Sequence, residues 1–475
     1  MDSNNKIVIL GAGITGLTAA WELSKKYKDK VVVLEKENSI GGLASTFKHG
    51  SFSFDIGSHR LHDDGSEIFQ VIKYLCGDEL LKRERKGKIL IRDRFIKYPP
   101  LPMDVISSFG LLQGVRFTYD LLSAKLLTPF KTKKHSSFKS YIESKIGKSL
   151  YKSFYEPYAI KLWAQDPDTI SSEPAINRVR KFSFISVLNS IKDAMQNNGS
   201  TYYYYPAKGI GYLSERVREE FINNGGNILF IDEIRKVNLE NDREVKSLVC
   251  KDKNGMLKEI KTEILISTIL MNDFYSIIND SMISKNGNLL NLKWRSLRIL
   301  YLLIKDKINF DSETLYFPES NTIIGRVSEV SKYSPELNNS SAMSALTIEI
   351  PCTYRDELWN MDDKSLTAIC LKELKKLGVV TNDSGSTLEA FSKKIKDLYP
   401  IYEIGWKEKY EKIYNHLDSI ENLFMIGRSA LFLHCNIDHC IDMGLKLAKF
   451  IANGRENKDE WNKVRREFFR YKVRE

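Results

Sequence analysis

The chain has 475 residues, of which 42% are apolar and 28% are charged, with 12 prolines and 27 glycines. This composition excludes a mainly disordered or fibrous protein. At roughly 100 to 200 residues per domain, the length predicts two to four structural units. Lys and Arg number 72 against 61 Asp and Glu, a net charge of +11. Such a surplus suits nucleic acid, an anionic membrane surface or a phosphorylated small molecule, and charge alone does not choose among them.

Six cysteines show no CxxC pair and no dense framework: Cys76, Cys250, Cys352, Cys370, Cys435 and Cys440. This usage favours a reducing compartment, in which the thiols are small buried hydrophobic groups. The apolar run before Gly11 is too short for a signal peptide, and no stretch of about 18 uncharged apolar residues occurs. We therefore expect a soluble, cytoplasmic protein.

The N-terminal segment has the order strand, glycine turn, helix, strand and acid. Lys6–Leu10 and Val31–Leu34 are β-branched runs typical of strands buried on both faces. Between them, the turn from Gly11 to Gly16 (GAGITG) leads into helical spacing over Leu17–Leu23. Glu35 ends the second strand, where a carboxylate can accept hydrogen bonds from ribose hydroxyls and would repel a 2′-phosphate. This order predicts a dinucleotide-binding unit.

A second, largely helical region is expected from about Ser66 to Tyr203, with basic interruptions such as Lys82–Lys88. Within it, apolar residues follow a helical spacing in Leu101–Phe130, at Leu111, Leu112, Val115, Phe117, Leu121 and Leu122. Lys131–Lys134 (KTKK) comes directly after this stretch. The pattern favours a core helix that ends in solvated lysines, and the alternative is a helix lying in a bilayer interface.

Strand patterns return in the second half of the chain, at Ile228–Ile231, Glu244–Cys250, Glu263–Ser267, Trp294–Ile304 and Ala345–Ile350. Asn254-Gly255 predicts a hairpin turn between the second and third of these strands. Near the C-terminus, a strand over Leu423–Ile426 and a helix over Ile437–Ile451 repeat the order of the N-terminal unit. The C-terminal part is therefore expected to complete the first domain.

Several segments resemble the flavin-containing amine oxidase superfamily, which includes protoporphyrinogen oxidase and UDP-galactopyranose mutase. The resemblance begins at Gly41–Ala44 (GGLA) and Phe54–Arg60 (FDIGSHR), and extends over nearly the whole chain. Its most specific later landmarks are Pro157–Trp163 (PYAIKLW), Gly427-Arg428 and Asn436–His439 (NIDH). The nearest branches are bacterial protoporphyrinogen-oxidase-like FAD proteins and the mutases.

The resemblance implies an α/β fold with a Rossmann-type (GR2-like) FAD-binding domain and an α+β substrate domain. The FAD-binding domain is expected to be discontinuous, built from residues 1–65, 204–282 and 405–454. The substrate domain would comprise residues 66–203 and 283–404, and residues 455–475 would form a basic C-terminal helix or tail.

The residues expected to bind FAD are Gly11, Gly13, Ile14, Thr15, Gly16, Glu35, Lys36, Gly41, Gly42, Leu43, Ser58, His59, Val237, Gly427, Arg428 and Asp438. A helix that begins near Asp438 would direct its positive N-terminal end at a polar ligand group. Asp438 is equally well explained as a plain N-cap. Arg428 would pair with the FAD pyrophosphate or with a substrate phosphate. FAD is expected to be non-covalent, because no Cys or His stands in a recognisable attachment motif.

His59 and Arg326 are the expected catalytic residues, because the matching histidine loop of the mutases lies over the flavin. The residues expected to bind substrate are Tyr98, Arg178, Tyr316, Arg326, Tyr399 and His434. Arginine forks suit phosphate oxygens. Two departures weigh against a uridine diphosphate: His434 stands where a mutase has a tyrosine, and Pro100 and Leu101 replace the aromatic and glutamine that contact uracil.

Two reactions stay open from the sequence. In the first, FAD accepts a hydride from a C–H group next to nitrogen or oxygen. In the second, reduced flavin isomerises a sugar nucleotide through an N5 adduct, with NAD(P)H as a candidate external reductant. The expected partner is a small molecule, phosphorylated or a sugar nucleotide in the second case. Nucleic acid is not expected, because the basic runs lack interleaved aromatic residues, and no metal-ligand spacing occurs.

Overall fold

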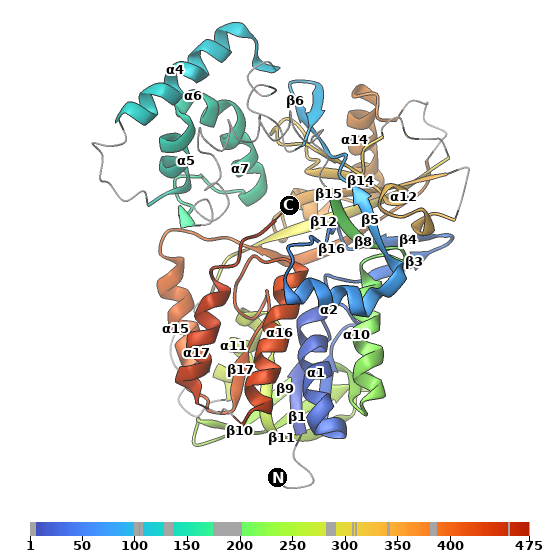
Figure 1. The fold of residues 1–475 in the computed structure, drawn as a ribbon, viewed down its shortest axis with the longest axis vertical. Helices are drawn as coiled ribbons and strands as arrows, with labels where there is room; N and C mark the ends of the chain where they lie inside the picture. Colours follow the sequence, from blue (N-terminus) through green and yellow to red (C-terminus); the bar gives the residue numbers. More distant parts are fainter. Residues whose placement is uncertain are drawn as a thin grey trace.

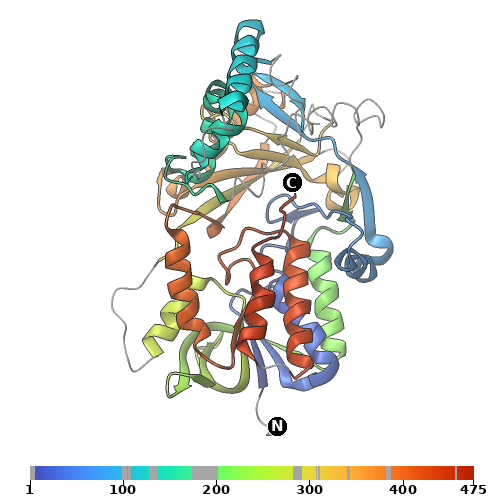
Figure 2. The same cartoon turned by 60° about the vertical axis from the view of Figure 1, so that its left-hand side comes forward.

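Two large β-sheets organise the chain, one in each half of the molecule (Figure 1). The computed structural model describes residues 6–98, 104, 108–127, 136–173, 202–281, 291–305, 308, 311–339, 343–380, 387–454 and 457–474. The N-terminus lies at the far end of the lower half, whereas the C-terminus lies at the waist between the halves in both views (Figures 1 and 2). The last residues are therefore close to the boundary where the functional site lies.

The sheet of the lower half contains β1 (Lys6–Leu10), β2 (Val31–Glu35), β9 (Asn227–Glu240), β10 (Glu244–Asp252), β11 (Leu257–Ser267) and β17 (Leu423–Met425). Strands β9, β2, β1, β11 and β17 pair in parallel in that order. Beyond this parallel part, β9, β10 and β11 continue as an antiparallel meander. The strands predicted in these segments are confirmed, as is the turn at Asn254-Gly255.

The helices of the lower half are α1 (Ile14–Tyr27), α10 (Gly211–Asn223), α11 (Met271–Ser281), α15 (Trp406–Asp418), α16 (Ile437–Ala452) and α17 (Lys458–Phe468) (Figure 1). The predicted helices after Gly16 and over Ile437–Ile451 are confirmed. Helices α1 and α16 lie side by side in Figure 1, and a Cβ on Gly444 would come within 2.8 Å of the Thr15 carbonyl oxygen. Glycine therefore permits the close approach of these two helices.

Two segments predicted outside the FAD-binding domain pack on the core of the lower half. Helix α2 (Glu67–Cys76) packs against α10 and α16, with Phe69 and Ile72 buried. The C-terminal segment forms α17, whose Trp461 and Phe468 are fully buried in the same core. Buried aromatic residues thus hold α17 in place, although the segment is rich in basic residues. The domain boundaries themselves stay a prediction.

The sheet of the upper half has the strand order β16 (Thr387–Pro400), β12 (Trp294–Ile304), β15 (Ser344–Cys352), β14 (Arg326–Glu329), β13 (Thr314–Tyr316), β6 (Lys88–Ile91) and β7 (Arg94–Lys97). Its pairs are antiparallel, except that β13 and β6 are parallel. Every residue of β12 is buried, as expected for a central strand. The strands predicted at Trp294–Ile304 and Ala345–Ile350 are confirmed.

The prediction of a largely helical region from Ser66 to Tyr203 is partly wrong. The basic run at Lys82–Lys88 belongs to β5 (Leu80–Glu84) and to the start of β6, and β5 pairs with β8 (Tyr202–Pro206). Along this run exposed residues alternate with half-buried ones, a period of two that fits an edge strand. The described helices in this region are α2, α4 (Leu111–Leu127), α5 (Phe138–Ile146), α6 (Lys148–Leu150) and α7 (Glu156–Trp163).

The remaining elements are short. A small hairpin joins β3 (Thr46–His49) to β4 (Phe52–Asp55), and α12 (Val330–Tyr333), α13 (Glu357–Asn360) and α14 (Asp363–Lys376) flank the upper sheet. Single turns of other helix types occur at Lys28–Lys30, Gly77–Glu79, Tyr151–Tyr155 and Pro335–Leu337.

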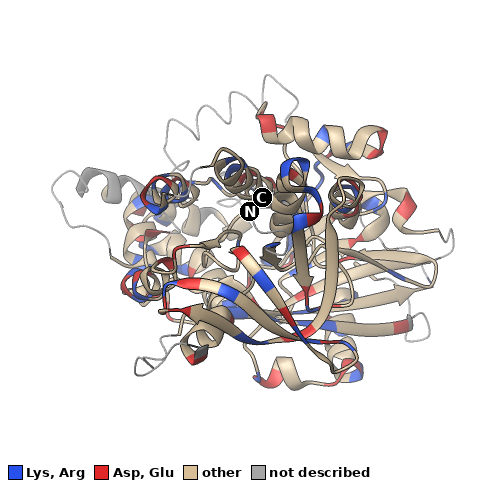
Figure 3. Cartoon of the chain, turned by 90° about the horizontal axis from the view of Figure 1, so that it is seen from below, with Lys and Arg blue, Asp and Glu red and all other residues tan. Residues whose placement is uncertain are grey.

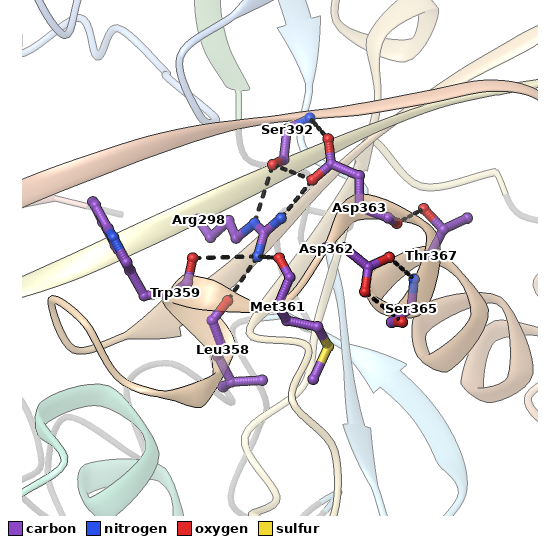
Figure 4. Close-up of polar contacts among 9 residues, drawn as sticks. All are labelled: Arg298, Leu358, Trp359, Met361, Asp362, Asp363, Ser365, Thr367 and Ser392. Atoms are coloured by element: carbon purple, nitrogen blue, oxygen red, sulfur yellow. Dashed lines mark hydrogen bonds and ion pairs between the residues drawn. The ribbon is translucent and has the colours of Figure 1, made fainter.

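Arg298 shows how a buried charge serves the fold rather than a ligand (Figure 4). Its side chain, on β12, donates to the Leu358 carbonyl at 2.8 Å, to the Met361 carbonyl and to the Asp363 carboxylate. Its Nε donates to the Ser392 hydroxyl at 3.0 Å. The guanidinium thereby fastens α13 and α14 to β12 and β16, which is a structural use of arginine.

Helix α4 leaves part of its apolar face at the surface. Phe117 is buried, but Leu112 is 90% and Val115 70% exposed. The prediction of a core helix is therefore wrong for these two exposed positions. The side chains of Leu111, Leu121 and Leu122, and the whole of Lys131–Lys134, lie outside the described residues. Binding of this face to a bilayer interface stays a prediction.

The described segments show neither a large basic patch nor a membrane-spanning helix (Figure 3). Basic and acidic residues alternate along the same elements in Figure 3, so the positive surplus is spread over the chain. In that part of the chain, no helix combines the length and the hydropathy needed to cross a membrane.

Candidate functional site

A cavity of about 1240 Å³ joins the two halves of the molecule. At one end it is lined by the glycine turn after β1 and by Glu35 at the end of β2. At the other end it reaches Arg326 on β14 and Glu349 on β15. Its volume exceeds the roughly 300 to 1000 Å³ of a pocket for one drug-sized ligand. It is therefore large enough for a dinucleotide together with a substrate.

The glycine turn fits a dinucleotide at one position in particular. A Cβ added at Gly13 would meet no protein atom within 4 Å and would project into open space, and Gly13 lines the cavity. By contrast, a Cβ at Gly16 would lie 2.0 Å from the Gly11 carbonyl oxygen. Gly16 thus serves the packing of α1 on the turn, whereas Gly13 keeps room for phosphates beside the N-terminus of α1.

Glu35 presents its carboxylate at the same end of the cavity. Its two oxygens accept hydrogen bonds from the backbone N–H groups of Ala12 at 2.6 Å and Glu37 at 2.7 Å. Burial raises the pKa of Glu35, and these backbone bonds oppose that shift. The carboxylate is fixed against the glycine turn, in a position suited to accept hydrogen bonds from ribose hydroxyls.

Arg428 enters the cavity from the turn after β17. Its two terminal nitrogens donate to the backbone carbonyls of Cys435 at 2.9 Å and Leu398 at 3.1 Å. Its Nε is buried and has no hydrogen-bond partner among the described residues. Because both bonds go to carbonyls, the positive charge of Arg428 is not neutralised by a carboxylate there. The residue can therefore donate to an anionic group of a bound ligand.

Helix α16 has Asn436 as its N-cap residue, and not Asp438. Helix α16 starts at Ile437, and Asn436 precedes it as the N-cap residue. The backbone N–H of Asn436 donates to Nδ1 of His439 at 3.1 Å. Asp438 is therefore in the first turn and is not the N-cap, and it does not line the cavity. The cap requires a residue in extended conformation, which Asn436 adopts.

His59 lies on the cavity wall in a loop that Glu349 holds. Oε1 of Glu349 accepts from the backbone N–H of Ser58 at 2.9 Å, directly beside His59. Burial, and then the positive charge of Arg326, lower the pKa of His59 to about 4. Its Nδ1 has no hydrogen-bond partner in the described part of the chain. His59 is therefore a neutral imidazole at pH 7 that can exchange hydrogen bonds with a ligand.

Arg326 makes a bidentate ion pair with Glu349. Nε lies 2.9 Å from Oε1 and Nη2 lies 2.5 Å from Oε2. The Glu349 side chain is 6% exposed and the Arg326 side chain 22% exposed. Arg326 therefore already has an anionic partner within the protein.

Tyr316 belongs to a neighbouring network around Arg60. The Arg60 guanidinium donates to the Tyr316 hydroxyl at 2.9 Å and to the Glu313 carboxylate at 2.9 Å. The ring of Tyr98 stacks on that of Tyr316, with centroids 4.3 Å apart. Tyr316 and Arg60 line the cavity, whereas Tyr98 lies behind Tyr316 and does not.

Tyr399 and His434 lie together on another part of the wall. Their ring centroids are 5.6 Å apart, and the Arg428 guanidinium lies 5.2 Å from the centroid of the Tyr399 ring. Both residues line the cavity. These rings thus border the positive charge of Arg428.

The structure brings most of the predicted site residues to one cavity. Those on its wall are Gly11, Gly13, Ile14, Thr15, Glu35, Gly41, Gly42, Leu43, Ser58, His59, Tyr316, Arg326, Tyr399, Arg428 and His434. Those described but not on its wall are Gly16, Lys36, Tyr98, Val237, Gly427 and Asp438. Arg178 lies outside the described residues. Among the described residues, no group of three His, Cys, Asp or Glu side chains could hold a metal ion.

Sequence reasoning missed Glu349, Lys161 and Arg60. A carboxylate inside the apolar run Ala345–Ile350 was a signal, because an ionised group in a buried strand needs a partner. Lys161 lines the cavity, and its Nζ donates to the carbonyls of Phe317 at 2.7 Å and Ile324 at 2.8 Å. Burial lowers the pKa of Lys161 to about 7. No pattern in the sequence indicated this contact.

The chain was compared with protein families and with curated proteins. A model of the family described as flavin containing amine oxidoreductase matches residues 14–449. The chain is 24% identical over 187 residues to coproporphyrinogen III oxidase of Bacillus subtilis (strain 168), covering 36% of this chain and 39% of that protein. The aligned segments span 31 to 39% of the first curated relatives, so the chain matches about a third of their length.

Two solved structures show the fold over nearly the whole chain. A reduced UDP-galactopyranose mutase has a TM-score of 0.79 at 19% identity, covering 96% of this chain and 95% of the mutase. An engineered putrescine oxidase has a TM-score of 0.63 at 13% identity, covering 95% and 99%. At such identities the likeness concerns the fold. Because the family match extends over most of the chain, the chain belongs to the flavin containing amine oxidoreductase family, whose members are FAD-dependent enzymes.

Proposed function

We propose that this oxidoreductase binds FAD without a covalent bond and oxidises a C–H group next to nitrogen or oxygen in a small molecule that carries no phosphate. The observation that carries the proposal is the buried ion pair between Arg326 and Glu349. Arg326 was the main candidate for a diphosphate site, and its charge is compensated inside the protein.

Two other basic residues on the wall also have partners within the protein. Arg60 is bound to Glu313 and Tyr316, and Arg428 is bound to two backbone carbonyls. A substrate diphosphate that bound to Arg326 would have to displace Glu349, and would leave this buried carboxylate without its cation, which is costly. This arrangement supports a neutral or cationic substrate.

Part of the cavity wall is apolar and aromatic. Its members include Tyr158, Leu162, Trp163, Leu297, Pro351 and Leu398. Such surfaces bind the hydrocarbon part of a ligand, while a few polar groups orient it.

One set of residues on the cavity wall would bind FAD, and another would bind the substrate. FAD, when bound, supplies the group that accepts the hydride. The glycine turn and Glu35 would hold its dinucleotide part, and Arg428 would donate to an anionic group. His59, neutral at pH 7, would make a hydrogen bond with the substrate through its unpaired Nδ1. Glu349 would keep the His59 loop in place through the Ser58 N–H.

A mutase-like reaction is the second candidate, and it has one observation in its favour. Tyr316, Arg326 and Tyr399 lie on the wall of the same cavity, as the resemblance to the mutases implied. In that reaction reduced flavin would isomerise a sugar nucleotide, and an external reductant such as NAD(P)H would be needed to reduce the flavin first. Arg326 would then exchange Glu349 for a substrate phosphate.

Anaerobic titration of the holoprotein separates the two reactions. A panel of amines, alcohols and porphyrinogen-like polycycles is added to the oxidised protein, and sugar nucleotides are added before and after chemical reduction. Loss of the flavin absorption band on adding an unphosphorylated substrate supports the oxidation. An isomerised sugar nucleotide that forms only after reduction would overturn it. The Lys25→Met variant, whose side chain is exposed on α1 and does not line the cavity, serves as the control.

A further inference from the structure

Two cysteines lie in contact where α16 begins. The Sγ atoms of Cys435 and Cys440 are 3.7 Å apart, and both residues line the cavity. Cys435 is 4% and Cys440 7% exposed, so bulky reagents cannot reach them from the surface, although a small molecule inside the cavity can. Among the described residues, the four other cysteines have no cysteine in contact.

The surroundings make the two thiols unequal. Cys440 is in the first turns of α16, where the helix N-terminus favours an anion. Hydrogen bonds from Cys435 and from the Thr15 hydroxyl, together with the positive charge of Arg428, lower the pKa of Cys440. The pKa of Cys435 is raised, first by its bond to Cys440 and then by burial. One thiol is therefore the easier to ionise, and the second stands beside it.

The other four cysteines have thiols that are harder to ionise than that of Cys440. Burial raises the pKa of Cys76, Cys352 and Cys370 to about 12 and that of Cys250 to about 11. Buried thiols of this kind react slowly, because the thiolate is the nucleophile. They provide internal controls within the same chain.

We propose that Cys435 and Cys440 are an oxidation site that forms a reversible disulfide with hydrogen peroxide, and that this bond loosens the FAD site. The Cys440 thiolate first attacks the peroxide, and with one proton this gives a sulfenic acid and water. The Cys435 thiol then attacks the sulfenic acid, so that an S–S bond forms and a second water leaves. In sum, two thiols and one peroxide give one disulfide and two waters.

The effect on FAD follows from the contact between Cys435 and Arg428. A disulfide requires the two sulfur atoms to approach from 3.7 Å to about 2.05 Å. This movement displaces the loop before α16, whose Cys435 carbonyl accepts a hydrogen bond from Arg428 at 2.9 Å. Losing this bond frees Arg428 to move from its position on the cavity wall, and we expect FAD binding to weaken by about tenfold. The FAD part of the inference rests on the family cofactor, whereas the disulfide does not depend on which reaction the enzyme catalyses.

Counting thiols tests the disulfide without any measurement of activity. The holoprotein is treated with a small excess of hydrogen peroxide, quenched with catalase, denatured and alkylated, and the alkyl groups are counted by mass spectrometry. The wild type, with six cysteines, should fall from six thiols to four, with the disulfide mapped to Cys435 and Cys440. Cys440→Ser should stay at five, and the control Cys352→Ser should fall from five to three. Six thiols in the treated wild type, or two lost in Cys440→Ser, would overturn the proposal.

Two further measurements test the order of events and the consequence. In Cys435→Ser, dimedone should label Cys440 after peroxide treatment, because the second thiol is missing. The dissociation constant of FAD should rise about tenfold in the oxidised wild type and return after treatment with dithiothreitol. Cys440→Ser should retain FAD equally with and without peroxide, which also shows that the variant is folded. An unlabelled Cys440, or an unchanged FAD affinity in the oxidised wild type, would contradict the inference.

Discussion

Arg326 and Glu349 face each other across the β14–β15 strand pair and form a bidentate ion pair there. The same carboxylate accepts the backbone N–H of Ser58 at 2.9 Å, so it also fixes the loop that carries His59. One ion pair in the upper sheet thus controls a loop on the cavity wall. A change at either residue is therefore expected to affect both stability and the site.

Replacing Arg326 with methionine should strongly destabilise the protein. The change leaves the Glu349 carboxylate, 6% exposed, without its cation, and breaking a buried pair typically costs about 3 to 5 kcal/mol. Adding Glu349→Gln should restore part of this loss, because the amide still accepts from Ser58 and carries no charge. The free energies of unfolding of the wild type, the two single variants and the double variant give the coupling.

A surface pair provides the control for this cycle. Lys25 and Glu22 form an ion pair in which the Lys25 side chain is 49% exposed, and Lys25→Met should change the free energy of unfolding by less than about 1 kcal/mol. If Arg326 instead serves a substrate phosphate, Arg326→Met should leave stability nearly intact and reduce sugar-nucleotide binding by about 2 to 5 kcal/mol. That pattern would favour the mutase reaction.

Two glycines of the same turn should respond in opposite ways to substitution by alanine. In Gly13→Ala the new methyl group meets no protein atom, so the flavin-free protein should keep its stability while FAD affinity falls by about tenfold or more. In Gly16→Ala the Cβ would lie 2.0 Å from the Gly11 carbonyl oxygen, so the fold itself should lose about 1 to 3 kcal/mol. Unfolding of the flavin-free proteins and FAD titration measure the two effects separately. Equal FAD affinity in Gly13→Ala and wild type would mean that the phosphates lie elsewhere.

The lower half of the molecule was largely predictable from the sequence. Its strands are continuous apolar runs, and the turn from Gly11 to Gly16 has a spacing whose physical reason is local. A local pattern also predicts that Glu35 ends β2. The prediction from Ser66 to Tyr203 was less successful, because β5 and β6 are short and gain their pairing from β8 and β13, far away in the sequence.

The interactions within the site could not be predicted in the same way. The pairing of Arg326 with Glu349 depends on strand register, and the bonds from Lys161 depend on how α7 packs on the upper sheet. Both are long-range contacts that leave no periodic signal. Sequence patterns indicated which arginines and tyrosines reach the cavity, and only the structure shows that Arg326 is already neutralised.

Lys161 should act as a positioning residue for the β13–β14 connection. Its Nζ donates to the carbonyls of Phe317 and Ile324, which flank the loop between Tyr316 and Arg326. Lys161→Met leaves both carbonyls without this donor and should cost about 1 to 3 kcal/mol of the free energy of unfolding. Hydrogen exchange at the amides of Phe317 and Gly325 should become faster. The exposed Lys332, changed to methionine, is the control and should alter neither quantity.

His59 should make the protein less stable as the solution is acidified. Burial lowers its pKa in the folded state to about 4, below the ordinary value of 6.5, so between these two values the unfolded chain binds a proton that the folded chain does not. Stability is therefore full above about pH 6.5 and falls as the pH drops toward 4, by at most about 3 kcal/mol for this one group. His59→Asn should reduce the slope of the free energy of unfolding against pH, measured by denaturant titration of the flavin-free protein from pH 7 to pH 4. Part of the slope should persist, because burial also lowers the pKa of His62 to about 4, and only the double variant with His62→Asn should remove both contributions. An unchanged slope in His59→Asn would show that folding does not lower the pKa of His59, and would contradict a buried imidazole that resists protonation.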